Sequence, residues 1–275
     1  MTTLLVVLAA LTAVIAAARS TWSPCGLSML SSITPLAEQG RGHRYRTTAC
    51  WFVAGSIFGG ASLGLVTALL AAGLGTAGLS STTLGTLALI ACLVAAASDT
   101  SSLKFRLPVH HRQVNERWLD QFRPWVYGAG FGWQIGAGLA TYIKTSALYL
   151  MIALAALTGD PWLAVGVGAL FGLVRGLAVF LGRGITNPAT LADFHHRFMA
   201  LDPRARQVVV AWELAAALTV SFTLSWAALA VAATTGAWAV TRRLLVRPQH
   251  PHQALPAHDS VTVPSPPDRT KAPSA

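Results

Sequence analysis

The first residue with a chemical role to consider is a cysteine that follows a proline. Cys25 ends the tripeptide Ser23-Pro24-Cys25, inside the first apolar part of the chain. Proline removes a backbone hydrogen bond and clashes with the preceding turn, so Pro24 predicts a break in that helix. A thiol at the N-terminus of a new helix is stabilised as the thiolate and becomes more reactive. Cys25 is therefore a candidate catalytic residue, with a packing cysteine at a kink as the alternative.

A second candidate site is a group of polar residues around Lys144. Ionisable residues at membrane depth are expensive, and each one is a functional candidate. Lys144 lies deep in the fourth apolar run, and polar side chains accompany it in that run and at the corresponding place in the first. We expect them to line a polar cavity for a small anion or a proton, with interhelical hydrogen bonding as the alternative. The companions of Lys144 are Thr34, Gln134, Thr141 and Thr145.

Two further charged residues lie inside apolar runs. Arg175 is eight residues before Arg183, and Glu213 is seven residues after Arg206. Both depths correspond to about 11 Å at the rise of an α-helix. We predict an intramembrane ion pair between Arg175 and Glu213, which either joins two spans or takes part in transport.

Histidines are the remaining candidates, and they occur as the adjacent pairs His110-His111 and His195-His196. Metal-binding histidines usually stand three or four residues apart or with other ligands. We therefore predict no metal site and no cofactor.

The composition indicates that these residues are carried by a membrane protein. The chain of 275 residues is 53% hydrophobic and 11% charged, with a mean hydropathy of +0.54. A soluble domain carries about 25% charged residues. The formal charge of +10 resides mainly in short loops between apolar runs, so we expect the lipid bilayer and not nucleic acid as the partner.

Six apolar runs are long enough to cross a bilayer, which takes about 20 residues. Between them, the loops 37–46, 98–124 and 183–206 hold twelve basic residues, and the alternate connections near 74–76 and 158–160 hold none. This asymmetry predicts a multi-pass protein of the cell (inner or plasma) membrane with the basic loops in the cytoplasm and the N-terminus outside. The runs are 3–36, 47–73, 77–97, 125–157, 161–182 and 207–241.

The order of the runs also suggests an internal repeat. The first and fourth runs are long and interrupted, and a constant offset places Trp22 on Trp133, Thr34 on Thr145 and Cys25 on Gly136. Three spans per half give the halves opposite orientations, an inverted repeat. We therefore predict an all-α bundle with a first half at 1–97, a cytoplasmic linker at 98–124, a second half at 125–241 and a disordered tail at 242–275.

The first sixty residues resemble a known family. Ser23-Pro24-Cys25, Pro35 about ten residues on, a basic loop, and the aromatic and glycine-rich segment 51–64 look like the CcdA family of the LysE superfamily, which includes the transmembrane domain of DsbD. The resemblance implies a thiol–disulfide electron carrier of the kind used in cytochrome c biogenesis. It also implies a thioredoxin-like or other thiol protein as partner.

The family uses a second cysteine in the fourth span, where this chain has Gly136. A dithiol cycles with a disulfide through a resolving thiol, so the resemblance implies a divergent single-cysteine form. Two alternatives stay open: a small-molecule or ion transporter of the LysE superfamily, and an assembly subunit of a membrane complex.

Overall fold

The structure is a computed structural model that describes residues 1–100, 122–139 and 142–224. All regular structure in these residues is helical, with no strand, which confirms the all-α prediction. Most of the expected linker and the whole expected tail lie outside the described residues. The helices are α1 (Thr2–Ser20), α2 (Pro24–Ser32), α3 (Pro35–Gly40), α4 (Tyr45–Thr76), α5 (Ser81–Asp99), α7 (Pro124–Gly136), α8 (Ala147–Leu157), α9 (Pro161–Leu177), the 3-10 helix η1 (Ala178–Gly184), α10 (Pro188–Ala200) and α11 (Asp202–Ser221).

Four of these helices are long and apolar enough to cross a membrane: α1, α4, α5 and α9 continued by η1. The first and fourth apolar runs are broken, as their interrupted patterns predict. The first run divides into α1 and α2 at Pro24, and the fourth divides into α7 and α8 around residues 137–146. Gly138 in the second break has a φ of 61°, a left-handed conformation that favours glycine.

Proline and a polar residue before it start several of the helices. Proline suits the first helical position, and a preceding Ser, Thr, Asp or Asn side chain accepts a hydrogen bond from a free backbone N–H of the first turn. The Ser23 hydroxyl accepts from the amide of Gly26 at 3.2 Å, and the Asp160 carboxylate accepts from the amide of Trp162 at 2.8 Å. The same arrangement opens α3 and α10, at Thr34 and Asn187.

The segment 183–206 was predicted to be a polar loop, and this prediction is wrong. It contains α10, whose N-cap Asn187 forms a capping box with Thr190. Phe198 on this helix stacks on Trp22 with ring centroids 4.4 Å apart, and its carbonyl accepts a hydrogen bond from the Trp22 indole at 2.8 Å. The tertiary contact with the first break stabilises a helix that hydropathy alone does not reveal.

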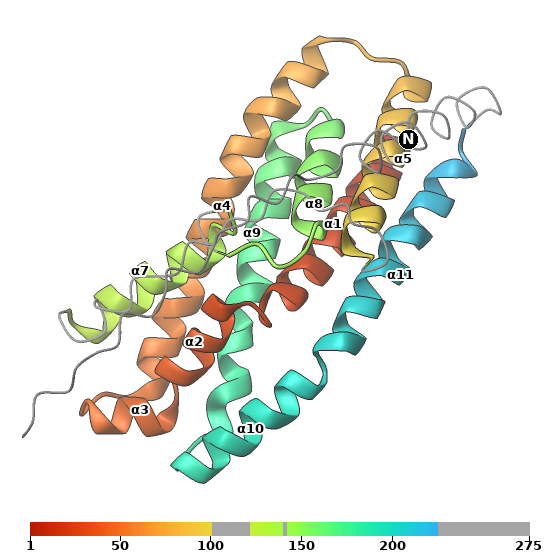
Figure 1. Cartoon of the computed structure of the whole chain (residues 1–275). Helices are drawn as coiled ribbons and strands as arrows, with labels where there is room; N and C mark the ends of the chain where they lie inside the picture. Colours follow the sequence, from red (N-terminus) through yellow and green to blue (C-terminus); the bar gives the residue numbers. More distant parts are fainter. Residues whose placement is uncertain (101–121, 140–141, 225–275) are drawn as a thin grey trace, which may run out of the picture.

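The packing of the bundle centres on the contacts of α4 with α7 and α9, and α4 itself runs along one side of the bundle (Figure 1). Small residues let these backbones approach closely. A Cβ atom at Gly60 would overlap the Gly168 carbonyl oxygen, and one at Gly136 would overlap the Ser56 carbonyl oxygen. The Ser56 hydroxyl donates to the Gly172 carbonyl at 2.7 Å. Around this centre, α1 packs on α8 and α9, and α5 packs on α11.

This packing predicts a sharp difference between two glycines of α4. Gly60→Ala should destabilise the protein by about 1–3 kcal/mol, because the added methyl group meets the α9 backbone and not a movable side chain. Gly73→Ala is the control, since nothing lies within 4 Å of a Cβ at Gly73. Thermal unfolding of the two variants in detergent should show a lower melting temperature for Gly60→Ala alone, and equal melting temperatures would contradict the packing argument.

Candidate functional site

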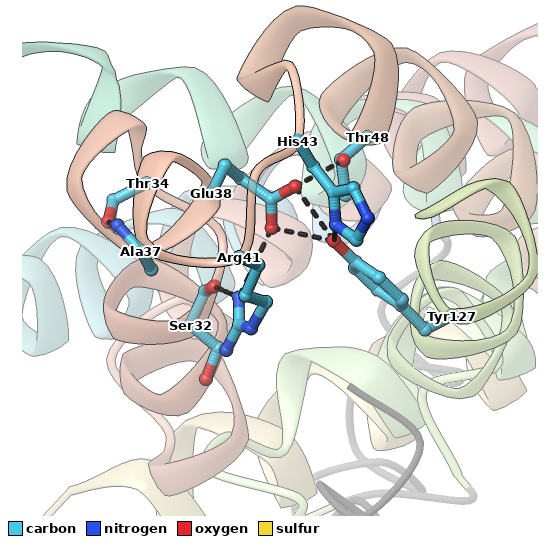
Figure 2. A network of polar contacts seen from close by, with 8 residues as sticks. All are labelled: Ser32, Thr34, Ala37, Glu38, Arg41, His43, Thr48 and Tyr127. Carbon is cyan, nitrogen blue, oxygen red and sulfur yellow. Dashed lines mark hydrogen bonds and ion pairs between the residues drawn. The ribbon is translucent and has the colours of Figure 1, made fainter. Parts of the chain in front are cut away.

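A buried carboxylate, Glu38, is the centre of the polar network shown in Figure 2. Its side chain is fully buried. The Tyr127 hydroxyl lies 2.7 and 2.8 Å from the two carboxylate oxygens, and the Thr48 hydroxyl donates to one of them at 2.6 Å. Buried charges persist in proteins where they are paired and hydrogen-bonded, and Glu38 meets that condition.

Two basic side chains extend this network. Arg41 donates to Glu38 Oε1 at 3.2 Å and to the Ser32 carbonyl at 2.8 Å, which joins the end of α2 to α3. His43 Nδ1 lies 3.4 Å from the Tyr127 hydroxyl, and the His43 amide donates to the Glu38 carbonyl at 2.8 Å. The arrangement holds a negative charge among α3, α4 and α7. It also brings the half-buried His43 imidazole to the Tyr127 hydroxyl.

The sequence argument missed Glu38, because it assigned 37–46 to a solvated basic loop. The informative signal was Thr34-Pro35, which opens a helix four residues before the glutamate. With α3 in place, the short turn through Gly42 (φ 73°) brings Thr48 of α4 back onto the carboxylate.

The Glu38 network predicts unequal effects for two tyrosine substitutions. Tyr127→Phe should lower the free energy of unfolding by about 1.5–3 kcal/mol, because it removes a hydrogen bond to a buried charge. Tyr45→Phe is the matched control: the Tyr45 hydroxyl donates to the neutral Val179 carbonyl at 3.0 Å, a bond that contributes about 0.5–1.5 kcal/mol. Denaturant unfolding in micelles measures both, and a loss no larger for Tyr127→Phe would mean that Glu38 is not ionised.

A second charged cluster joins the two helix breaks at Asp202, the first residue of α11. Asp202 Oδ1 accepts from Arg19 Nη1 at 2.6 Å and lies 3.6 Å from Lys144 Nζ. Arg19 is the penultimate residue of α1, and Lys144 precedes α8. Lys144 is therefore an anchor of the second break, paired with an acidic residue that the sequence argument had not connected to it.

Asp99, at the end of α5, fixes the same break from the other side. Its carboxylate accepts from the Thr145 hydroxyl and from the Ser146 amide, the latter at 3.0 Å. The Ser146 hydroxyl donates to the Ala95 carbonyl at 2.9 Å. Residues of α5 thus bind Thr145 and Ser146, the last two residues before α8.

The Asp202 cluster predicts an acid-sensitive contribution to stability. Partial burial acts to raise the pKa of Asp202, but the hydrogen bond and charge of Arg19 and the charge of Lys144 outweigh it and hold the pKa below its ordinary value. A depressed carboxyl pKa contributes stability at neutral pH that is lost as the pH falls through the folded-state value. Asp202→Asn should therefore lower the melting temperature at neutral pH and have a shrinking effect in acid.

Asp193→Asn is the control for this experiment. Asp193 pairs with Arg197 on the exposed face of α10, where ion pairs contribute little. Its effect on melting temperature should be small at every pH. If Asp202→Asn lowers the melting temperature by the same amount at neutral and acid pH, the negative charge of Asp202 does not contribute the stability.

The remaining predicted polar residues do not gather with Lys144 and Thr145. Thr34 is buried as the N-cap of α3, Gln134 is half-buried on α7, and Thr141 lies outside the described residues. One cavity, of about 240 Å³, lies elsewhere, lined by Met1, Leu4, Ser81, Thr82 and Thr223. No group of three or more His, Cys, Asp and Glu in the described parts of the chain could hold a metal ion.

The predicted ion pair between Arg175 and Glu213 is wrong. Both residues are buried, but the ion pairs of the described residues do not include it, and neither oxygen of Glu213 has a hydrogen-bond partner. Arg175 lies on α9, which packs on α4 and α1, and Glu213 lies on α11, which packs on α5 and α1. Equal depth in two runs therefore did not make Arg175 and Glu213 neighbours. The helices that carry them, α9 and α11, each pack on α1 and not extensively on each other.

Cys25 is a packing residue at the start of α2, and 1% of its surface is exposed. It lies in an apolar cluster with Met29, Phe52 and Ile135. All three cysteines of the chain are in the described residues, and none of them forms a disulfide. Gly136, at the place expected for a second cysteine, is pressed against the Ser56 backbone.

Comparison with known proteins identifies relatives of a different kind from those expected. The methylamine utilization protein MauF of Paracoccus denitrificans is 36% identical over 169 residues, which cover 58% of this chain and 58% of that protein. The MauF of Methylobacillus flagellatus is 27% identical over 197 residues, or 66% of each chain, and that of Methylorubrum extorquens is 30% identical over 158 residues. No family model and no solved structure matches. The chain spans less than two thirds of the length of these curated relatives.

These findings overturn the CcdA-like identification and the thiol–disulfide carrier function inferred from it, because the relatives are named MauF. The physical reason is visible at the motif. Ser23 caps a helix and Pro24 begins it, so Ser-Pro-Cys describes a helix start that leaves Cys25 in the core. The predicted roles in cytochrome c biogenesis, LysE-type transport and complex assembly find no support among these relatives. The expected thiol partner stays a prediction, because the comparisons do not test it.

Proposed function

We propose that this chain is a membrane-embedded accessory protein of methylamine utilization, of the kind named MauF. The observation that carries the proposal is the 36% identity to the Paracoccus denitrificans protein over 169 residues. MauF proteins of four further bacteria support it.

The exposed tryptophans support a position across the bilayer. Trp51 and Trp125 lie side by side near the starts of α4 and α7, with ring centroids 6.1 Å apart, and they are 46% and 51% exposed. Trp162 is 84% exposed and lies near the other end of α4. It is three residues after Gly159, which contacts Gly75 of α4. From Trp51 to Gly75 is about 36 Å at the helix rise. Tryptophan belts mark the two interfaces of a hydrocarbon core about 30 Å thick.

The packing supports the finer architecture of six spans in two inverted halves. The second helices of the two predicted halves, α4 and α9, pack on each other, α1 packs on α8, and α5 packs on α11. A two-fold axis in the membrane plane brings corresponding elements together in this way. Arg41 directly follows α3 and Arg197 lies on α10, and both helices are at the end of the bundle away from the α4–α5 turn (Figure 1). We infer that this end is cytoplasmic.

Growth on methylamine tests the proposed function directly. In Paracoccus denitrificans deleted for its MauF, we expect this chain, or a MauF chimera carrying its 169 matched residues, to restore growth on methylamine. Growth on succinate is the control for general fitness. If the chimera is present in the membrane fraction at the level of native MauF and growth on methylamine is not restored, the proposal fails.

A further inference from the structure

Glu213 is the buried carboxyl group that neither charged cluster uses. It is 0% exposed, and both of its carboxyl oxygens lack a hydrogen-bond partner. It is eleven residues beyond Asp202 along α11, which corresponds to about 16 Å at the helix rise. Since Asp202 lies at the level of the helix breaks, Glu213 lies well inside the bundle.

Within the described residues, the helices packed against α11 present no compensating cation to Glu213. On α5 the titratable groups are Cys92 and Asp99, and Asp99 binds Thr145 and Ser146 before α8. On α1 the one charged residue is Arg19, which is bound to Asp202. On α10 the charged pair Asp193 and Arg197 is exposed, and the charge that acts on Glu213 is that of Asp99.

The contrast with Glu38 shows what this environment requires. Glu38 is equally buried, but it receives hydrogen bonds from Tyr127, Thr48 and Arg41. An ionised carboxylate without such donors is strongly disfavoured in an apolar interior, and the group remains neutral instead. A carboxylic acid also leaves no charge beside Asp99.

We propose that Glu213 is a proton-binding site within the α5–α11 interface, occupied by a proton at neutral pH. Removing that proton adds a second negative charge to an interface whose other helix already carries Asp99, and loosens α11 from α5. Asp99 also holds Thr145 and Ser146, so occupancy of the site is coupled to the backbone break that carries Lys144. The ligand is the proton itself, taken up by one carboxylate oxygen.

Infrared spectroscopy of the full chain in lipid nanodiscs tests the proposal. The carbonyl stretch of a protonated carboxylic acid should be present at neutral pH, absent in Glu213→Gln and lost from the wild type only in alkali. Glu213→Asp keeps an acid at this position and should shift the band without removing it, which provides a second test if the Gln variant folds poorly. A neutral-pH spectrum without the band, or a band unchanged in both variants, would overturn the proposal.

Two further measurements separate a proton from a metal cation and test the coupling. Adding Na⁺, K⁺ or Ca²⁺ at neutral pH should leave the band unchanged, and its loss would show that the site takes a cation instead. A group that retains its proton only in the fold costs stability as the pH rises. The melting temperature of the wild type should therefore fall relative to Glu213→Gln with increasing pH, and a constant difference would refute the link to the α5–α11 interface.

Discussion

The close approach of α4 to α7 and α9 is the constraint on which the rest of the structure depends. In a bilayer, lipid tails are as apolar as leucine, so helices associate through close packing and hydrogen bonds between helices. Glycines along α4 let the backbones of two neighbours approach on different faces, and Ser56 adds a hydrogen bond to the Gly172 carbonyl. The outer face of α4 keeps large apolar side chains such as Phe58 and Leu69 exposed. Small residues thus form the face of α4 that packs on α7 and α9, and large apolar residues form its exposed face.

Because the central helices are packed so tightly, the irregular and charged parts of the chain are placed around them. Backbone breaks at membrane depth are tolerated only where the freed polar groups find partners. Here Asp99 and Asp202 hold the segment before α8, and Asp202 also binds Arg19 at the end of α1, where the first break begins. Glu38 holds the turn between α3 and α4. The cost of burying these carboxylates is offset by donors from helices distant in sequence. The charged clusters therefore also connect the two halves of the chain.

The sequence predicted the helical class and the two broken runs, because hydropathy and proline act locally. It did not predict which charged residues would meet. The Arg175–Glu213 pair failed because depth along a helix says nothing of which helix is the neighbour, and Glu38 was missed because a short capped helix turned an expected loop residue inward. The helix in 183–206 was missed because it is stabilised by Trp22, a residue far away in sequence. Cys25 was misinterpreted for a similar reason. The tripeptide Ser23-Pro24-Cys25 fits the start of a capped helix as well as it fits a redox motif, and the sequence alone does not distinguish the two.

Glu38, Asp202 and Glu213 differ in how many hydrogen-bond donors and cations their carboxyl groups contact, and this difference separates a structural role from a proposed functional one. Glu38 has three donors, and Asp202 has two cations at the edge of the bundle. Both are accounted for by the contacts they stabilise. Among the described residues, Glu213 has neither a donor nor a cation, and it lies against a helix whose own carboxylate is engaged elsewhere. A residue so costly for the fold contributes nothing to packing that an apolar side chain would not do better. The proton proposed above accounts for this carboxyl group, because the protonated acid carries no charge into the interior.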